Sequence, residues 1–108
     1  MTNEELTRVC SEISRECGVD FAAFLGRTQW PKDVAARRVA SAVLHGRFGQ
    51  NPHAIAQRVW GVCHKSVTDR LVSHAKLMER DADYRALYAR CLSRLGLAGV
   101  EQEQEVAA

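Results

Sequence analysis

Residues 51–78 read NPHAIAQRVWGVCHKSVTDRLVSHAKLM, and their pattern is the most informative in the chain about its structure. Asn51 and Pro52 pair an N-cap residue with a proline suited to the first turn of a helix. The short helix that they open is predicted to end near Gly61, a natural break in the chain. A second, longer helix is predicted from about His64. Two helices joined by a tight glycine turn are typical of a helix-turn-helix, whose second helix enters the DNA major groove.

An αα-hairpin inside an ordinary helical bundle would give the same pattern. The second helix has apolar or small residues at helical intervals, which are expected to face the core: Val67, Leu71, Ala75 and Met78. Its first two turns carry polar side chains that a recognition helix would present to DNA: His64, Lys65, Ser66, Asp69 and Arg70.

The rest of the chain also predicts helices. Their expected ranges are Thr2 to Gly18 with Glu5 completing a capping box, 21–25 after an Asp20 cap, Pro31 to Gly49, and an Asp81 cap to Gly96. No strand-like alternation occurs. We therefore expect an all-α, six-helix single domain over residues 1–96, followed by a flexible acidic tail over residues 97–108.

Positive charge is concentrated in the middle of the chain. Residues 27–80 carry ten Lys or Arg against three acids and all four histidines, whereas residues 1–26 and 81–108 are net acidic. A basic middle favours a polyanionic partner, because neutralising phosphates releases counterions. A solvated charged surface on an ordinary helical protein has the same composition, so charge alone leaves both interpretations open.

The cysteines and the start of the chain bear on the compartment. The four cysteines form no Cys-x-x-Cys pair; they are Cys10, Cys17, Cys63 and Cys91. The first residues are polar and acidic, unlike a signal peptide, and no apolar run reaches the roughly 20 residues of a membrane span. We expect a cytoplasmic, nucleoid-associated protein with reduced thiols, in which Cys10, Cys17 and Cys91 belong to the core.

From Ile55 to Val67 the sequence IAQRVWGVCHKSV resembles the signature of the C-terminal DNA-binding domain of the bacterial replication initiator DnaA. The residues that carry the likeness are Ile55, Gly61, His64, Ser66 and Val67. Residues 34–38, VAARR, resemble the opening of that family's long helix, and Leu6 to Leu25 resemble its leading helix. The likeness covers about residues 6–95.

This resemblance implies a Trp-repressor-like helical domain that reads DNA from the helix after Gly61. The family's base and phosphate contacts map onto His64, Lys65 and Ser66, and an arginine of its long helix maps onto Arg38. Trp30 stands where the family has a minor-groove arginine, with Arg27 and Lys32 nearby. No G-x-x-x-x-G-K-[ST] nucleotide loop occurs.

The predicted DNA contacts are therefore the residues of the second helix and a set of surrounding cations. That set comprises Arg27, Lys32, Arg37, Arg38, Arg47 and Arg58. We expect no metal, because Cys63 and the histidines lack a ligand spacing, and no cofactor. No catalytic group is expected either, because nothing marks a nucleophile with an orienting partner. Trp30 and Trp60 are interpreted as core or cap residues, with a wedge against DNA as the alternative for Trp60.

These features together predict a non-enzymatic, double-stranded DNA-binding protein, a bacterial or phage regulator of replication or transcription. The alternative is a protein-interaction module that keeps the fold without sequence-specific DNA binding. Such a module would dock a protein through the acidic N-terminal helix or the tail. The sequence leaves the oligomeric state open.

Overall fold

The computed structural model describes residues 1–97 of the 108-residue chain, and no strand occurs in that range. Its helices are α1 (Asn3–Glu16), α2 (Phe21–Leu25), α3 (Pro31–Gly46), α4 (Pro52–Ile55), α5 (His64–Arg80) and α6 (Ala82–Arg94), and a π-helical turn, η1 (Ala56–Trp60), continues α4. The predicted all-α class with six helices is confirmed. Apart from Leu97, the predicted tail lies outside the described residues.

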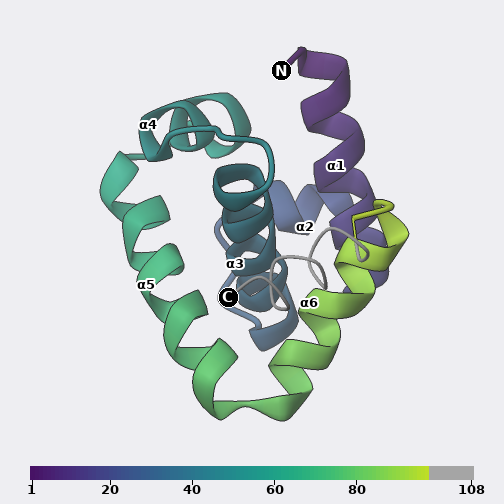
Figure 1. Cartoon of the computed structure of the whole chain (residues 1–108). Helices are drawn as coiled ribbons and strands as arrows, with labels where there is room; N and C mark the ends of the chain where they lie inside the picture. Colours follow the sequence, from purple (N-terminus) through teal and green to yellow (C-terminus); the bar gives the residue numbers. More distant parts are fainter. Residues whose placement is uncertain (98–108) are drawn as a thin grey trace.

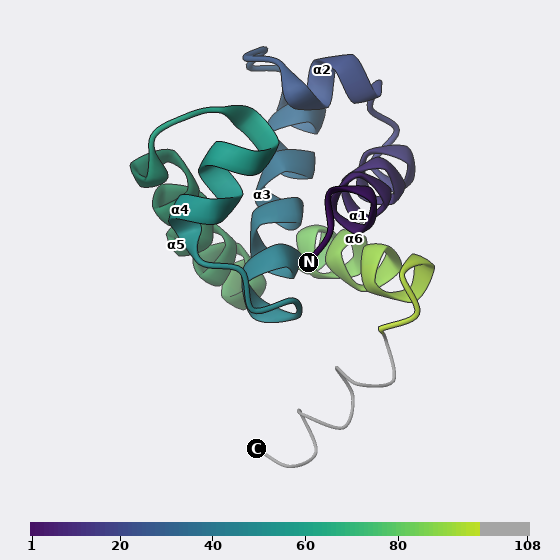
Figure 2. The same ribbon diagram turned by 90° about the horizontal axis from the view of Figure 1, so that it is seen from above.

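Helix α3 is the central element, and every other α-helix contacts it. Figures 1 and 2 show it between α5 on one side and α1 with α6 on the other. Six consecutive residues of α3, from Val39 to Leu44, are buried. An unbroken buried run is expected of a helix covered on all sides, whereas a surface helix buries only a stripe.

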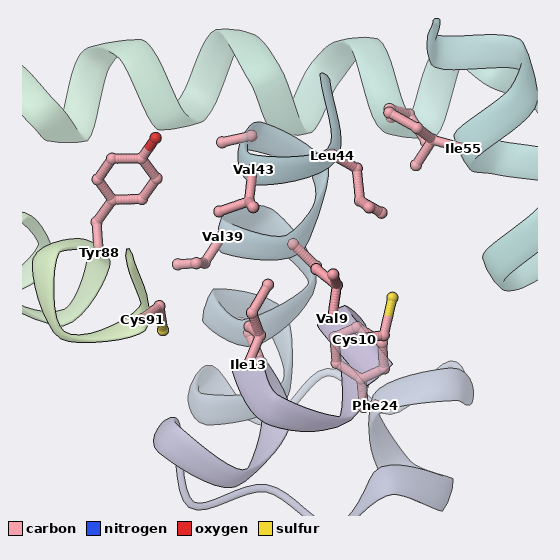
Figure 3. Packing of buried hydrophobic residues seen from close by; sticks show 14 of the residues in the cluster. Val9, Cys10, Ile13, Phe24, Val39, Val43, Leu44, Ile55, Tyr88 and Cys91 are labelled. Carbon is pink, nitrogen blue, oxygen red and sulfur yellow. The ribbon is translucent and has the colours of Figure 1, made fainter. Parts of the chain in front are cut away.

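The core joins the two halves of the chain. Val9 and Ile13 from α1 meet Phe24 from α2 and Val43 from α3, and Ile55 closes the cluster from α4 (Figure 3). All five side chains are almost completely buried. Full burial of an aliphatic or aromatic side chain contributes roughly 1.5–3 kcal/mol. This core therefore holds the short helices α2 and α4, which would not be stable alone.

Side-chain caps begin three of the helices as predicted. Thr2 Oγ1 accepts from the backbone N–H of Glu5 at 3.1 Å, and Asn51 Oδ1 accepts from that of Ala54 at 2.8 Å. The Asp81 carboxylate does the same for α6, at 3.0 Å. Asp20 occupies the N-cap position of α2, but its side chain makes no capping hydrogen bond.

The helix-turn-helix segment departs from the prediction at its first helix. The α-helical spacing ends at Ile55 and gives way to η1, because the N–H groups of Gly61 and Val62 both donate to the carbonyl of Ala56. Gly61 then takes a left-handed conformation, with φ of 62°, which favours glycine. The prediction of a plain α-helix up to Trp60 is therefore wrong in its last turn, while the predicted break is confirmed.

Helix α5 is less buried than its apolar spacing predicted. Val67 is fully buried, but Leu71 and Met78 are half-buried and Ala75 is exposed. Helix α5 packs on α3 and then meets α6 at Asp81, so its outer face lies at the edge of the molecule (Figure 1). This geometry leaves a long helical face open to solvent.

Candidate nucleic-acid interface

The start of α5 is shaped for contact with an anion. Cys63 occupies its N-cap position without a side-chain capping bond, and His64 and Lys65 are exposed in the first turn. The free N–H groups of a helix N-terminus carry partial positive charge, which favours a phosphate. The turn at Gly61 thus presents this end of the helix to solvent.

His64 is held by the preceding helix. Its ring stacks on that of His53 in α4, with the ring centroids 4.0 Å apart, and Cys63 Sγ lies 3.9 Å from its Nδ1. Both histidines remain exposed. A ring held this way can still present a nitrogen to a base edge or a phosphate oxygen.

Lys65 forms an ion pair with Asp69 one turn later, at 3.2 Å. Both side chains are mostly exposed, at 78% and 66%. An exposed pair of this spacing is worth only about 0.3–0.5 kcal/mol, so a phosphate could replace the carboxylate. Asp69 lowers the positive charge of this turn and would repel the DNA backbone.

Arg37 was predicted to contact DNA, and this prediction is wrong because its side chain is buried. Its Nε donates to the carbonyl of Phe24 at 2.9 Å, and its Nη2 donates to that of Ala23 at 2.6 Å. Nη1 and Nη2 also bind the carbonyl and the hydroxyl of Thr28. Burial lowers the pKa of Arg37, and the charge of Asp33 opposes this effect. The guanidinium fastens α2 and the following loop onto α3.

The other predicted cations occupy varied positions. Arg27 and Lys32 are exposed, whereas Arg38 and Arg47 are half-buried. The guanidinium carbon of Arg38 lies 5.8 Å from the centroid of the Tyr84 ring.

Arg58 is exposed but already engaged with the start of the chain. Its Nη2 donates to the Met1 carbonyl at 2.8 Å and to Asn3 Oδ1 at 2.9 Å. A phosphate contact by Arg58 would compete with these bonds, which join η1 to α1.

The pairing of Arg70 with Trp60 is a feature that the sequence did not reveal. The Arg70 guanidinium carbon lies 4.4 Å from the centroid of the Trp60 ring. The indole is itself fixed, because its Nε1 donates to the Phe24 carbonyl at 3.0 Å. Trp60 is half-buried against the core, as its core interpretation predicted. Trp30 is 73% exposed and occupies the N-cap position of α3, so of the two interpretations the cap position is correct for that residue and the core is wrong.

The structure brings several of the predicted residues together. Arg27, Ser66 and Arg70 line one half-enclosed pocket of about 470 Å³, beside His64 and Lys65 at the start of α5. Arg47 follows the far end of α3, and Arg58 faces the start of α1. The predicted cations therefore do not form one continuous patch.

No group of three or more His, Cys, Asp or Glu side chains in residues 1–97 could hold a metal ion. None of the helices in that range is long and apolar enough to cross a membrane. No protein-family model, curated protein or solved structure matches this chain.

Proposed function

We propose that this chain binds double-stranded DNA with the first turn of α5 in the major groove. The observation that carries the proposal is the exposure of His64 and Lys65 at the start of α5, next to a pocket lined by arginines. A helix N-terminus with exposed polar side chains suits base contacts, and nearby cations suit phosphates.

The mechanism assigns different tasks to neighbouring residues. His64 reads a base edge or fixes a phosphate, while Lys65 and Ser66 bind the backbone at the same turn. Val67 holds the helix to the core from its inner face, where it is fully buried. A protein that binds DNA in this way is suited to the regulation of replication or transcription in association with the nucleoid.

The test is titration of labelled duplexes, first a random pool and then sites selected from it, at several salt concentrations. Each phosphate neutralised contributes about −0.9 to the slope of log K against log salt. Arg37 is buried and Arg58 is engaged, so three to five contacts and a slope of about −3 to −4.5 are expected. No binding to a long duplex at low salt would contradict the proposal.

The alternative, a protein-interaction module, also has an observation in its favour. Trp30 is 73% exposed and Leu25 is 41% exposed. Trp30 also lines an apolar hollow of about 580 Å³ with Val19 and Pro31. An exposed tryptophan beside such a hollow is common at protein interfaces. Loss of a copurifying protein from the Trp30→Ala variant, together with unchanged DNA binding, would favour this alternative.

A further inference from the structure

The pocket at the start of α5 has a composition that points to a ligand. It lies between the α2–α3 loop, the turn at Gly61 and α5, and its polar lining includes Arg27, Arg37, Ser66 and Arg70. We propose that this pocket is a binding site for a single phosphate group. The proposal goes beyond DNA binding and does not depend on it.

The pocket has an excess of positive charge. Three of its lining residues are arginines, and none of its lining residues is acidic. The negative charge of the Asp33 carboxylate favours the charged form of Arg37, and this carboxylate also accepts a hydrogen bond from the Thr28 hydroxyl. Like charges held close together in a partly buried site repel each other. A bound anion would relieve that repulsion.

Arg70, which lines this pocket, has a hydrogen-bond donor that the described residues leave unused. Its Nη1 is buried and has no hydrogen-bond partner within residues 1–97. Burial of the guanidinium, together with the charges of Arg37 and Arg38, lowers the pKa of Arg70. A buried donor without a partner is costly, so an acceptor such as a phosphate oxygen would stabilise this arrangement.

The donors are also held in place before any ligand arrives. The Arg70 guanidinium lies over the Trp60 ring, and the Phe24 carbonyl fixes that ring through its indole N–H. Ser66 precedes Arg70 by one turn of α5, so the two residues share a face of the helix. Arg37 uses four of its five N–H donors in bonds to main-chain and hydroxyl oxygens, which fixes its positive charge at the wall of the pocket. Preorganised donors lose little freedom on binding.

Two sources could supply this chemistry, a free phosphate compound or a phosphodiester of the DNA backbone. The pocket volume of about 470 Å³ leaves room for the substituent of a phosphate ester. The experiment below separates the sources, because a diester bears one negative charge and inorganic phosphate bears up to two near neutral pH.

Trp60 provides a probe inside the pocket. The chain has two tryptophans, so the Trp30→Phe variant leaves Trp60 as its only indole. In this background, inorganic phosphate, pyrophosphate and dimethyl phosphate are titrated at constant ionic strength, with chloride as the reference salt. We expect a saturable change in Trp60 emission with at least one phosphate compound and none with chloride.

Three further variants test the assignment by calorimetry as well as by fluorescence. Arg70→Gln and Ser66→Ala should each weaken phosphate binding about tenfold or more, because each removes a donor. Ser66→Ala keeps the Arg70–Trp60 contact, so its effect does not depend on a change in the probe. Lys76→Gln removes an exposed charge elsewhere on α5 and should leave the affinity unchanged.

The outcomes separate this proposal from the proposed function. Phosphate binding that depends on Arg70 supports the pocket even if the chain binds no duplex. If dimethyl phosphate saturates the pocket, and if Arg70→Gln reduces the slope of log K against log salt for duplex binding by about one, the DNA backbone is the source of the phosphate. Saturation by inorganic phosphate with an unchanged slope identifies a free phosphate compound. A response equal to that with chloride, or equal affinity in all variants, overturns the proposal.

Discussion

The Nε of Arg37 donates to the main-chain carbonyl of Phe24 at 2.9 Å, which joins the centre of the molecule to the last turn of α2. The same oxygen accepts from the indole N–H of Trp60 at 3.0 Å. One carbonyl group therefore connects α3, α2 and η1. Because Trp60 supports Arg70, the position of a candidate ligand-binding arginine depends on this buried contact.

Replacing Arg37 should destabilise the fold. Arg37→Met keeps much of the side-chain volume but leaves the carbonyls of Ala23, Phe24 and Thr28 without this donor. The Phe24 carbonyl keeps the Trp60 indole as a donor, and the Ala23 carbonyl keeps the N–H of Gly26. The loss is therefore that of hydrogen bonds from a charged group, each worth about 1.5–3 kcal/mol, and we expect a total of about 2–4 kcal/mol after local rearrangement. Urea unfolding measures the loss. Lys32→Met, at an exposed position of α3, is the control, and equal stability of the two variants would contradict the structural role of Arg37.

Truncation of two apolar residues should have unequal effects. Ile13 is fully buried between α1 and α3, so Ile13→Ala should cost about 2–5 kcal/mol. Leu71→Ala should cost less, about 1–2 kcal/mol, because Leu71 is half-buried and water can fill the space that it leaves. Thermal and urea unfolding would compare them. A larger loss for Leu71→Ala would mean that a partner, such as a second copy of the chain, covers α5.

His74 should make stability depend on pH. Its Nδ1 lies 2.6 Å from the Tyr84 hydroxyl, and burial, together with the charge of Arg38, lowers its pKa from 6.5 to about 4. The folded state thus binds fewer protons than the unfolded state between these values. The contribution of His74 to the free energy of unfolding is therefore fully present above pH 6.5 and is lost as the pH falls towards 4. It is at most about 3 kcal/mol, and smaller because the ring is only half-buried.

The measurement is urea unfolding from pH 4 to pH 7.5. His74→Gln keeps a hydrogen-bonding side chain without the titration, so its stability should fall less steeply over this range. His45→Gln, at an exposed histidine, is the matched control and should follow the parent curve. A parent curve that coincides with that of His74→Gln would show that this histidine titrates normally.

The cysteines should differ sharply in reactivity. Cys63 is exposed, Cys17 is half-buried with its Sγ 4.0 Å from that of Cys91, and burial raises the pKa of Cys10 to about 12. A disulfide reagent must reach the sulfur atom, and Cys63 is the one exposed cysteine of the four, so the reagent should modify Cys63 first. The reaction is followed by the thiol that the reagent releases as it modifies each cysteine. Cys63→Ser should abolish the fast phase of this release. Equally fast release from all thiols would mean that the helices open readily at α1 and α6.

Local signals in the sequence were sufficient for most helix boundaries. The caps at Thr2, Asn51 and Asp81 depend on residues three positions apart, so they could be predicted without the fold. The left-handed conformation of Gly61 could also be predicted, because glycine is the residue that most readily adopts it after a helix. The change to π-helical spacing could not, because it depends on which N–H groups reach the Ala56 carbonyl.

The environment of the arginines could not be predicted, because it depends on which helix is central. Helix α3 is covered on all sides, so the usual division into an apolar and a polar face fails there. Arg37 therefore lies inside although its neighbour Arg38 is only half-buried. The contact between Arg70 and Trp60 likewise joins residues of two helices whose relative placement no spacing encodes.

The last prediction separates base reading by α5 from general attraction to charge. His64 and Lys65 are neighbours in the first turn of α5, both exposed, so their removal should change no core contact. A base-edge contact typically contributes about 1–3 kcal/mol of discrimination, whereas a phosphate contact affects all sequences about equally. His64→Ala should therefore weaken a selected site more than a random duplex, and Lys65→Gln should weaken both by similar factors. Anisotropy titrations would measure both affinities, with circular dichroism to verify folding. Equal losses on both duplexes for His64→Ala would exclude His64 as a base reader, and binding would then depend on charge alone.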